Sequence, residues 1–136
     1  MTLEEMLAQK RATTRKKPSD EEHRIQCSCV RWFNLKYRKL KGRLFAVPNG
    51  GKRDALTGAK LKAEGVVAGV ADLILLKSNR FYGALLVEMK TKIGKQSKSQ
   101  IDWEKNITLQ GEYKYVVCHS IDDFIREVDD YLKYCD

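Results

Sequence analysis

The sequence predicts an α/β fold in which a mixed β-sheet of about four strands is flanked by α-helices. The main observation is a pair of short apolar runs, residues 73–76 and 84–87, joined by a turn-forming segment at residues 78–83. Short runs rich in aliphatic residues are typical of buried strands, and the short turn makes the two strands an antiparallel hairpin. Two more apolar segments, 43–47 and 113–119, have amphipathic helical stretches beside them. Strands and helices in this order form a sheet with helices on its faces.

The length and the charge of the chain limit what it can be. At 136 residues the chain suits one domain with a sizeable core. We expect a basic, flexible arm over residues 1–18 and a single domain over residues 19–136. The formal net charge of +8 at pH 7 indicates a polyanionic partner, with nucleic acid ahead of a membrane surface.

Targeting signals and cysteine pairs are not expected. The apolar runs fall well short of the roughly 20 residues that a membrane helix needs, and the first residues have neither the basic leader nor the apolar core of a signal peptide. An intracellular, cytoplasmic protein that does not bind membranes is expected. The four cysteines form no C-x-x-C pair, which favours reduced, buried thiols over disulfides or a zinc site.

The first helix should begin with Ser19 as its cap and Glu22 at its third position, in a capping-box pattern. It should end before Gly42 after turning five apolar residues toward the core: Ile25, Val30, Trp32, Phe33 and Tyr37. Capping alone would account for Glu22, which also lies one turn before Gln26 on a common side of the helix.

A glycine-rich turn at residues 49–53 follows the strand 43–47 and Pro48. It fits neither a P-loop nor a dinucleotide fingerprint, and as a turn it needs no function. Lys52 and Arg53 nevertheless make it a candidate phosphate contact, because glycines let a ligand approach the backbone. A short helix through Leu56, Ala59 and Ala63 should end at Gly65 and present Lys60 and Lys62 outward.

Two helices and a strand should complete the fold. Ser97 or Ser99 can cap a helix that ends at Gly111 and carries one stripe of four residues: Gln100, Trp103, Glu104 and Ile107. Gln100 could also close a capping box with Ser97. After a strand over residues 113–119, residues 120–123 cap a last helix whose inward side chains are Ile121, Phe124, Ile125, Val128 and Leu132.

The hairpin brings two acids together. If Lys77 pairs with Gly83, counting outward places Asp72 opposite Glu88, with their Cβ atoms about 4.5–5.5 Å apart. Lys90 emerges on the face of Glu88 because side chains alternate along a strand. Two like charges this close need a shared proton, a cation or solvent, and carboxylates beside a backbone carbonyl suit Mg²⁺ or Mn²⁺ better than zinc. The alternative is a salt-bridged pair where the hairpin ends in solvent.

These residues resemble the PD-(D/E)xK nuclease superfamily, and more closely its VRR-NUC family of virus-type replication and repair nucleases, in the small stand-alone form. The likeness runs from about residue 21 to residue 131. Six features in order carry it: Glu22 and Gln26, residues 47–53, residues 61–66, residues 69–72, Glu88-Met89-Lys90, and Ser97 through Gln100 to Trp103. One departure is Ala71, where the family often has proline. Since proline binds no metal, we expect this difference to have little effect on the site.

The resemblance implies a restriction-endonuclease-like core and a set of site residues. Asp72, Glu88 and the Met89 carbonyl would hold Mg²⁺ or Mn²⁺, and Lys90 would orient the attacking water or help deprotonate it. Glu22 would reach the site through a water or a second ion, and Gln100 would position the water or a phosphate oxygen. Six residues are candidates for contacts with nucleic acid: Asn49, Gly50, Lys52, Arg53, Lys60 and Lys62.

The expected function is a metal-dependent DNA endonuclease that prefers branched DNA, such as four-way (Holliday) junctions, to a sequence. Symmetric cleavage of a junction needs two active sites, so a homodimer is expected. No organic cofactor is implied. One alternative is a nicking or restriction-like nuclease on simple duplexes. Another is a binding protein that keeps a nuclease fold without catalysis. The only two histidines, His23 and His119, lie in no nuclease motif, which disfavours histidine-based hydrolysis.

Overall fold

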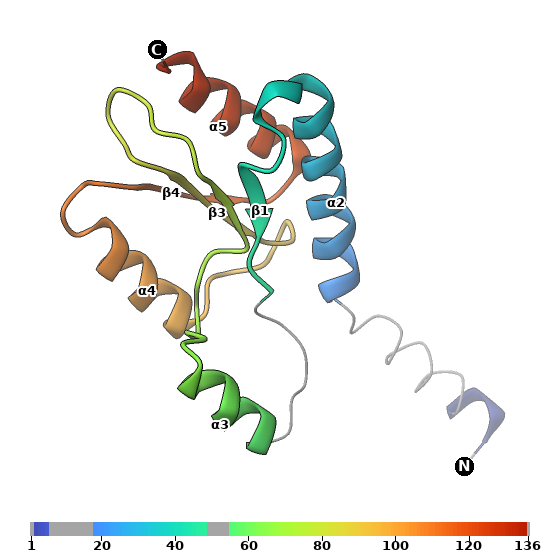
Figure 1. Cartoon of the computed structure of the whole chain (residues 1–136). Coiled ribbons are helices and arrows are strands. Elements are labelled where there is room, and N and C mark those ends of the chain that lie inside the picture. The colour runs from blue at the N-terminus through green and yellow to red at the C-terminus, as the bar shows by residue number, and fades with distance from the viewer. Residues whose placement is uncertain (1, 6–17, 49–54, 136) are drawn as a thin grey trace.

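The computed structural model describes residues 2–5, 18–48 and 55–135 (Figure 1). Four strands form its sheet: β1 (Leu44–Ala46), β2 (Leu73–Leu75), β3 (Leu85–Met89) and β4 (Lys114–Cys118). The helices with defined bounds are α2 (Pro18–Lys36), the short 3₁₀ helix η1 (Arg38–Leu40), α3 (Ala55–Ala63), α4 (Lys98–Thr108) and α5 (Ile121–Lys133). None of the helices in these ranges is both long enough and apolar enough to cross a bilayer.

The sheet is mixed, as the sequence predicts. Its strands lie in the order β1-β2-β3-β4. The pairs β1–β2 and β2–β3 are antiparallel, and the pair β3–β4 is parallel. Parallel neighbours need a crossover connection, which α4 supplies between β3 and β4. Three-residue strands at β1 and β2 replace the longer runs expected at residues 43–47 and 73–76.

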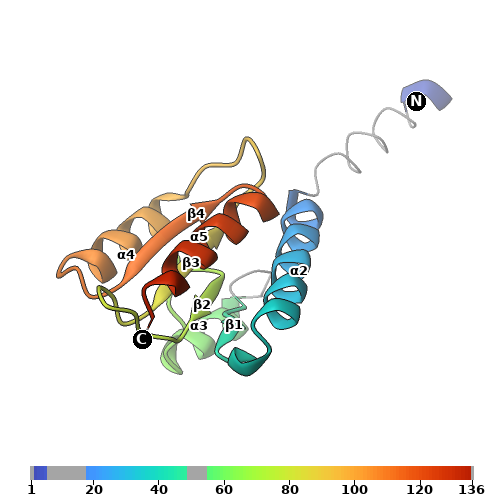
Figure 2. The same cartoon turned by 90° about the horizontal axis from the view of Figure 1, so that it is seen from above.

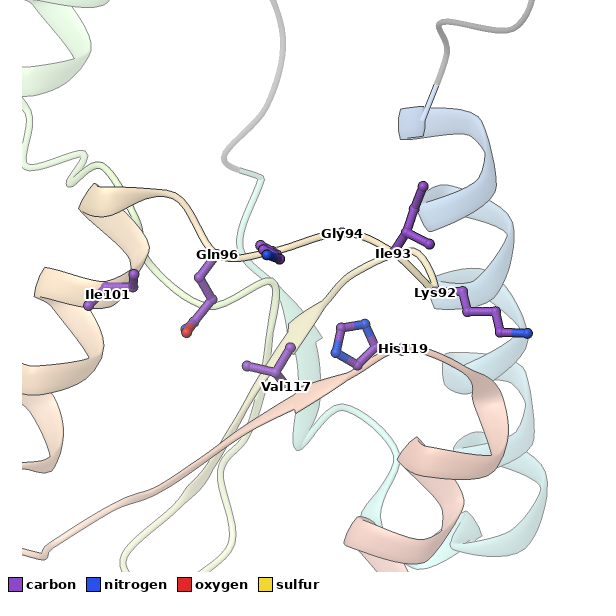
Figure 3. Close-up of a pocket in the computed structure, with 8 residues that line it drawn as sticks. Lys92, Ile93, Gly94, Gln96, Ile101, Val117 and His119 are labelled. Atoms are coloured by element: carbon purple, nitrogen blue, oxygen red, sulfur yellow. The ribbon is translucent and has the colours of Figure 1, made fainter.

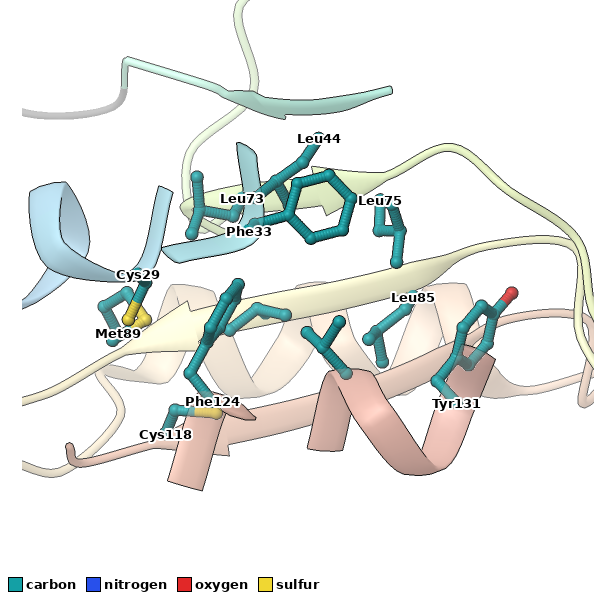
Figure 4. Close-up of a cluster of buried hydrophobic side chains, with 12 residues drawn as sticks. Cys29, Phe33, Leu44, Leu73, Leu75, Leu85, Met89, Cys118, Phe124 and Tyr131 are labelled. Atoms are coloured by element: carbon teal, nitrogen blue, oxygen red, sulfur yellow. The ribbon is translucent and has the colours of Figure 1, made fainter. Parts of the chain in front are cut away.

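The main core lies between the sheet and the pair of helices α2 and α5, whereas α4 lies across the opposite face (Figures 1 and 2). Because successive side chains of a strand point to opposite faces, Leu85, Val87 and Met89 of β3 enter this core and Glu88 points away from it. Figure 4 shows the core cluster, which comprises Cys29, Phe33, Leu44, Leu73, Leu75, Leu85, Val87, Met89, Cys118, Phe124, Val128 and Tyr131.

The two long helices differ from expectation in detail. Helix α2 begins at Pro18, so Ser19 lies in its first turn and is not the cap that the sequence predicts. The physical reason is that proline suits a first helical position, since its fixed φ is helical and its missing N–H would be unsatisfied there. Cys29 and Phe33 are the fully buried residues of α2, while Ile25, Val30, Trp32 and Tyr37 pack at the margin of the core.

Helix α5 begins as predicted, because the Ser120 side chain accepts a hydrogen bond from the Asp123 N–H. Phe124 and Val128 are buried, and Tyr131, which was not predicted to face inward, is buried with them. The cysteines are free, but only Cys29 and Cys118 are fully buried. The prediction of a buried thiol is wrong for Cys27, which is exposed on α2.

Tyr131 should make the stability of the protein fall at alkaline pH. Its hydroxyl donates to the Lys77 carbonyl at 2.5 Å, and burial raises its pKa from 10.0 to about 12. Since the folded pKa is the higher one, the stabilisation is present below pH 10 and is lost as the pH rises toward 12. We expect Tyr131→Phe to lower the free energy of unfolding by about 1 kcal/mol at neutral pH, with the gap closing above pH ~10. Urea unfolding over this pH range measures it, and a gap that stays constant would contradict the assignment.

Candidate active site

The hairpin has the register that the sequence predicts. Leu73 lies opposite Val87, Ile74 opposite Leu86, and Leu75 opposite Leu85. One further step outward places Asp72 opposite Glu88. The connection between the strands is longer than expected and is shaped by Asn79, whose Oδ1 accepts hydrogen bonds from two backbone N–H groups of the loop.

Asp72 is held against the end of β3 by the backbone. Its Oδ2 accepts a hydrogen bond of 2.7 Å from the Met89 N–H. In an extended strand the N–H and the C=O of one residue point to the same side, so the Met89 carbonyl is directed toward the side of Asp72. The Asp72 carboxylate and the Met89 carbonyl therefore converge where β2 begins and β3 ends.

Glu88 is a buried carboxylate with several partners. Its side chain is only 1% exposed. Oε1 accepts a hydrogen bond of 2.9 Å from Gln100 Nε2, and Oε2 accepts one of 3.3 Å from the Tyr115 hydroxyl. Lys90 Nζ lies 3.9 Å from Oε1. Burial and the neighbouring Asp72 carboxyl raise the pKa of Glu88 to about 8, against the lowering effect of Lys90 and Tyr115.

Glu22 reaches the same cluster from the first turns of α2. Burial raises the pKa of its carboxyl, Lys90 opposes the rise and Asp72 adds to it, while the Thr91 backbone donates a hydrogen bond to the carboxylate. These interactions place Glu22 beside the end of β3. A pure capping role for Glu22 is therefore disfavoured.

Gln100 closes the capping box that the sequence predicts, and it also contacts Glu88. Its Oε1 accepts from the Ser97 N–H at 2.7 Å, and its own N–H donates to Ser97 Oγ at 3.3 Å, which completes a capping box at the start of α4. Its Nε2 donates to Glu88 at the same time. The start of α4 is thus tied directly to the buried carboxylate.

Two alanine substitutions should separate these roles. Ser97→Ala removes a cap acceptor and should lower the free energy of unfolding by about 1 kcal/mol. Gln100→Ala also takes a donor from the buried Glu88 carboxyl group, and should cost about 1–3 kcal/mol more. Urea unfolding of the two variants at one pH measures the difference. Equal losses would mean that the contact with Glu88 contributes nothing.

Tyr115 and Gln96 are site residues that sequence reasoning missed. Gln96 Nε2 donates to the Tyr115 hydroxyl at 3.2 Å and to Glu104 Oε1 at 2.9 Å, so a chain of polar groups leads from α4 to Glu88. The Tyr115 ring lies 6.1 Å from that of Trp103. Tyr115 stands beside Leu86 because β4 runs parallel to β3 in this register. Alternation along residues 113–119 would have put Tyr115 on one face of the strand, but the partner strand is not a local property of the sequence.

Only two of the six residues expected to contact nucleic acid lie within the described part of the chain. Lys60 and Lys62 are exposed on α3, in agreement with the prediction. The loop after α3 reaches the site region, since a Cβ on Gly69 would lie 2.2 Å from the Ser99 carbonyl oxygen. The other four candidates, Asn49, Gly50, Lys52 and Arg53, lie outside the described residues.

The oxygen groups around Asp72 suit a hard divalent cation. Within the described ranges, no group of three or more His, Cys, Asp or Glu side chains forms a set that could hold a metal ion. A cation here would therefore rest on two carboxylates, Asp72 and Glu88, and on the Met89 carbonyl. Such an all-oxygen set fits Mg²⁺ or Mn²⁺, and a cation would offset the repulsion that raises the pKa of Glu88.

Comparison with known proteins gives one kind of match. A solved structure described as a VRR_NUC domain protein is similar to this chain, with a TM-score of 0.72 and 25% sequence identity. The similarity covers 85% of this chain and 90% of that chain. No protein-family profile matches the chain, and no curated protein is similar to it at a significant level.

Proposed function

In fold this chain is of the VRR-NUC type, and from that premise we propose that it is a metal-dependent endonuclease that hydrolyses DNA phosphodiester bonds. The likeness to a VRR_NUC domain protein supports a nuclease of that family. The observation that carries the finer proposal is the meeting of two carboxylates, Asp72 and Glu88, beside the ammonium group of Lys90. A buried Glu88 beside a half-buried Asp72 is costly for stability, and paired carboxylates of this kind can hold a cation that assists hydrolysis.

Each residue of the site has a role in this proposal. Mg²⁺ or Mn²⁺ would be held by Asp72, Glu88 and the Met89 carbonyl. When bound, the cation would lower the pKa of the attacking water and offset the negative charge that develops around the phosphorus atom. Lys90, whose Nζ lies 3.9 Å from Glu88 Oε1, would orient the attacking water or help deprotonate it.

Glu22 and Gln100 support this centre from two helices. Glu22 accepts a hydrogen bond from the Thr91 backbone, and its carboxylate could hold a water or a second ion. Gln100 fixes Glu88 through a hydrogen bond of 2.9 Å, and with it fixes the carboxylate oxygen that faces Lys90.

The proposed substrate is branched DNA, such as a four-way junction, and the proposed enzyme is a homodimer of one nuclease domain over residues 19–136. Lys60 and Lys62 are exposed and would contact phosphates, together with Asn49, Gly50, Lys52 and Arg53. Contacts of this kind make affinity fall with rising salt. A cytoplasmic location is proposed with it.

A cleavage assay tests the proposal. Labelled junction, flap, splayed-arm and linear DNAs are incubated with the protein in Mg²⁺ and in Mn²⁺. We expect Asp72→Asn, which keeps an acceptor for the Met89 N–H, to lower the junction cleavage rate by about 10³-fold. Asp102→Asn makes the same chemical change at an exposed position of α4 and should leave the rate unchanged. Folded Asp72→Asn protein with wild-type activity would remove Asp72 from the site, and equal rates on linear and branched DNA would remove the substrate preference.

A further inference from the structure

A tight turn follows Lys90 directly. The Gly94 N–H donates to the Thr91 carbonyl at 3.0 Å, which closes a four-residue turn with Lys92 and Ile93 at its centre. The His119 ring braces this turn, because its Nδ1 lies 2.8 Å from the same carbonyl oxygen. A carbonyl only accepts, so His119 Nδ1 carries a proton and donates it to Thr91. The turn is thus held between the end of β3 and the end of β4.

Ile93 stands at the tip of this turn with 89% of its surface exposed, more than any other large hydrophobic residue in the described part of the chain. A single exposed apolar side chain is ordinary in proteins. The surroundings of Ile93 are less ordinary. A shallow hollow of about 770 Å³ opens beside it, and Ile101, Val117 and the His119 ring are among the residues that line it (Figure 3).

The rim of the hollow is cationic. Lys92 and Lys95 line it, and Figure 3 shows the Lys92 side chain reaching away from the turn. Between Glu88 and Asp102 the sequence has four lysines and no acidic residue: Lys90, Lys92, Lys95 and Lys98. The last three are exposed, and within the described ranges none of them has an ion-pair partner. The hollow therefore combines apolar contact surface with unneutralised positive charge.

We propose that this hollow is a subsite for an unpaired nucleotide of the DNA strand that runs past Asp72 and Glu88, an inference that rests on the proposed function. Its apolar walls, Ile93 and Ile101, and the His119 ring would contact the base, while Lys92 and Lys95 would contact the flanking phosphates. A base offers a flat apolar face with polar edges, and a cationic groove with aromatic platforms is the usual way to bind it in a single strand. In this hollow the His119 ring is the aromatic surface, and the isoleucines extend the apolar contact around it.

The position of the turn links the subsite to the cleavage site. Ile93 follows Glu88 by five residues, which an extended chain spans in at most about 17 Å. This is within about five base steps along one DNA strand. Gln96 lines the hollow and donates to Tyr115, which donates to Glu88, so the two sites share one polar chain.

The subsite gives a physical reason for a preference for distorted DNA. A base inside a duplex must first leave its pair and its stack, which costs a few kcal/mol, whereas a base at a bulge, flap or branch point has already done so. Contact with the hollow then adds affinity only for DNA that offers a free base. The expected gain is about 5- to 150-fold per base.

Binding without cleavage tests this inference. Fluorescence anisotropy in EDTA compares a short duplex that contains one unpaired nucleotide with the same duplex fully paired. The full-length protein should prefer the bulged duplex by about 5- to 150-fold. Ile93→Ser should remove most of that preference while leaving the affinity for paired duplex within about twofold. His119→Asn, which keeps a donor for the Thr91 carbonyl but lacks the ring, should reduce the preference as well.

A matched control and a second readout make the test decisive. Leu109→Ser replaces an equally apolar residue, 81% exposed just past the other end of α4, and should change nothing. With 2-aminopurine as the unpaired base, its fluorescence should change on binding to wild type and not to Ile93→Ser. If wild type does not prefer the bulged duplex, or if Ile93→Ser keeps the preference, the subsite is refuted even for an active nuclease. If the preference depends on Ile93 but no DNA is cleaved, the subsite stands and the proposed nuclease activity falls.

Discussion

Replacing Glu88 by glutamine should greatly slow the proposed DNA cleavage and, at the same time, make the metal-free protein more stable. The loss of activity should be about 10³-fold, because a neutral amide is a poor ligand for Mg²⁺ and leaves the proposed site with one carboxylate. The gain in stability follows from burial. Glu88 is 1% exposed beside Asp72, and an ionised carboxyl there is unfavourable unless a cation compensates for it.

The sign of the pH dependence follows from the raised pKa. Glu88 titrates near 4.5 when it is unperturbed and at about 8 in the folded protein, with burial as the largest cause and Asp72 as the next. In the folded protein the Glu88 carboxyl therefore stays protonated up to a higher pH than in the unfolded chain. The stability linked to this group is complete below pH 4.5 and is lost as the pH rises through 8. The Glu88→Gln variant does not lose this stability. Its free energy of unfolding should exceed that of wild type only slightly at low pH, and by about 1–3 kcal/mol at pH 8.

Urea unfolding in EDTA at several pH values, beside the same series in Mg²⁺, measures this effect. Mg²⁺ should restore much of the stability of wild type at pH 8 and should affect Glu88→Gln little. Glu112→Gln makes the same change at an exposed position and should follow wild type throughout. A Glu88→Gln protein that is less stable than wild type at every pH would contradict a repulsive acidic pair.

Adding one methyl group at Gly69 should damage both the fold and the site. Gly69 has φ +84, a left-handed conformation that costs other residues about 1–2 kcal/mol. An added Cβ would also lie 2.2 Å from the Ser99 carbonyl oxygen and 2.9 Å from the Gln100 nitrogen, both backbone atoms. Overpacking of this kind costs about 1–3 kcal/mol more. The start of α4 must move, and Gln100 would lose its place beside Glu88.

The expected result for Gly69→Ala is a loss of about 2–5 kcal/mol in the free energy of unfolding and about 10²-fold in cleavage rate. Gly111→Ala is the matched control. Gly111 follows α4 with φ +72, and an added Cβ there meets nothing within 4 Å. The Gly111→Ala variant should be destabilised only by its left-handed backbone conformation and should keep its activity. Equal stability losses in the two variants would mean that the contact at Ser99 is unimportant.

The parts of this protein that sequence alone predicts are those that depend on neighbouring residues. The register that sets Asp72 opposite Glu88 follows from two apolar runs and the turn between them, and the structure confirms it. The caps at Ser97 and Ser120 are local patterns as well, and both are formed. Their side chains bond to backbone groups three residues away, so no tertiary contact is needed to recognise them.

Features that depend on distant parts of the chain were missed. Tyr115 touches Glu88 because β4 pairs in parallel with β3, and the intervening α4 hides that pairing from any local pattern. Tyr131 faces inward because Lys77 and Tyr82, on the hairpin loop, offer carbonyl acceptors to its hydroxyl. Helix α2 begins at Pro18, two residues before the Asp20 start that the Ser19 pattern predicts, because a capping signal and a helix-starting proline compete there.

The connection between β2 and β3 divides the two carboxylates between separate stretches of chain. Asp72 and Glu22 precede that loop, whereas Glu88, Lys90 and Gln100 all follow it. A protein split within residues 76–84 would therefore leave each fragment with an incomplete set of ligands. If the chain has the proposed nuclease activity, only reassembled halves would show it, and this loop would be the place to divide a conditional nuclease into two inert pieces.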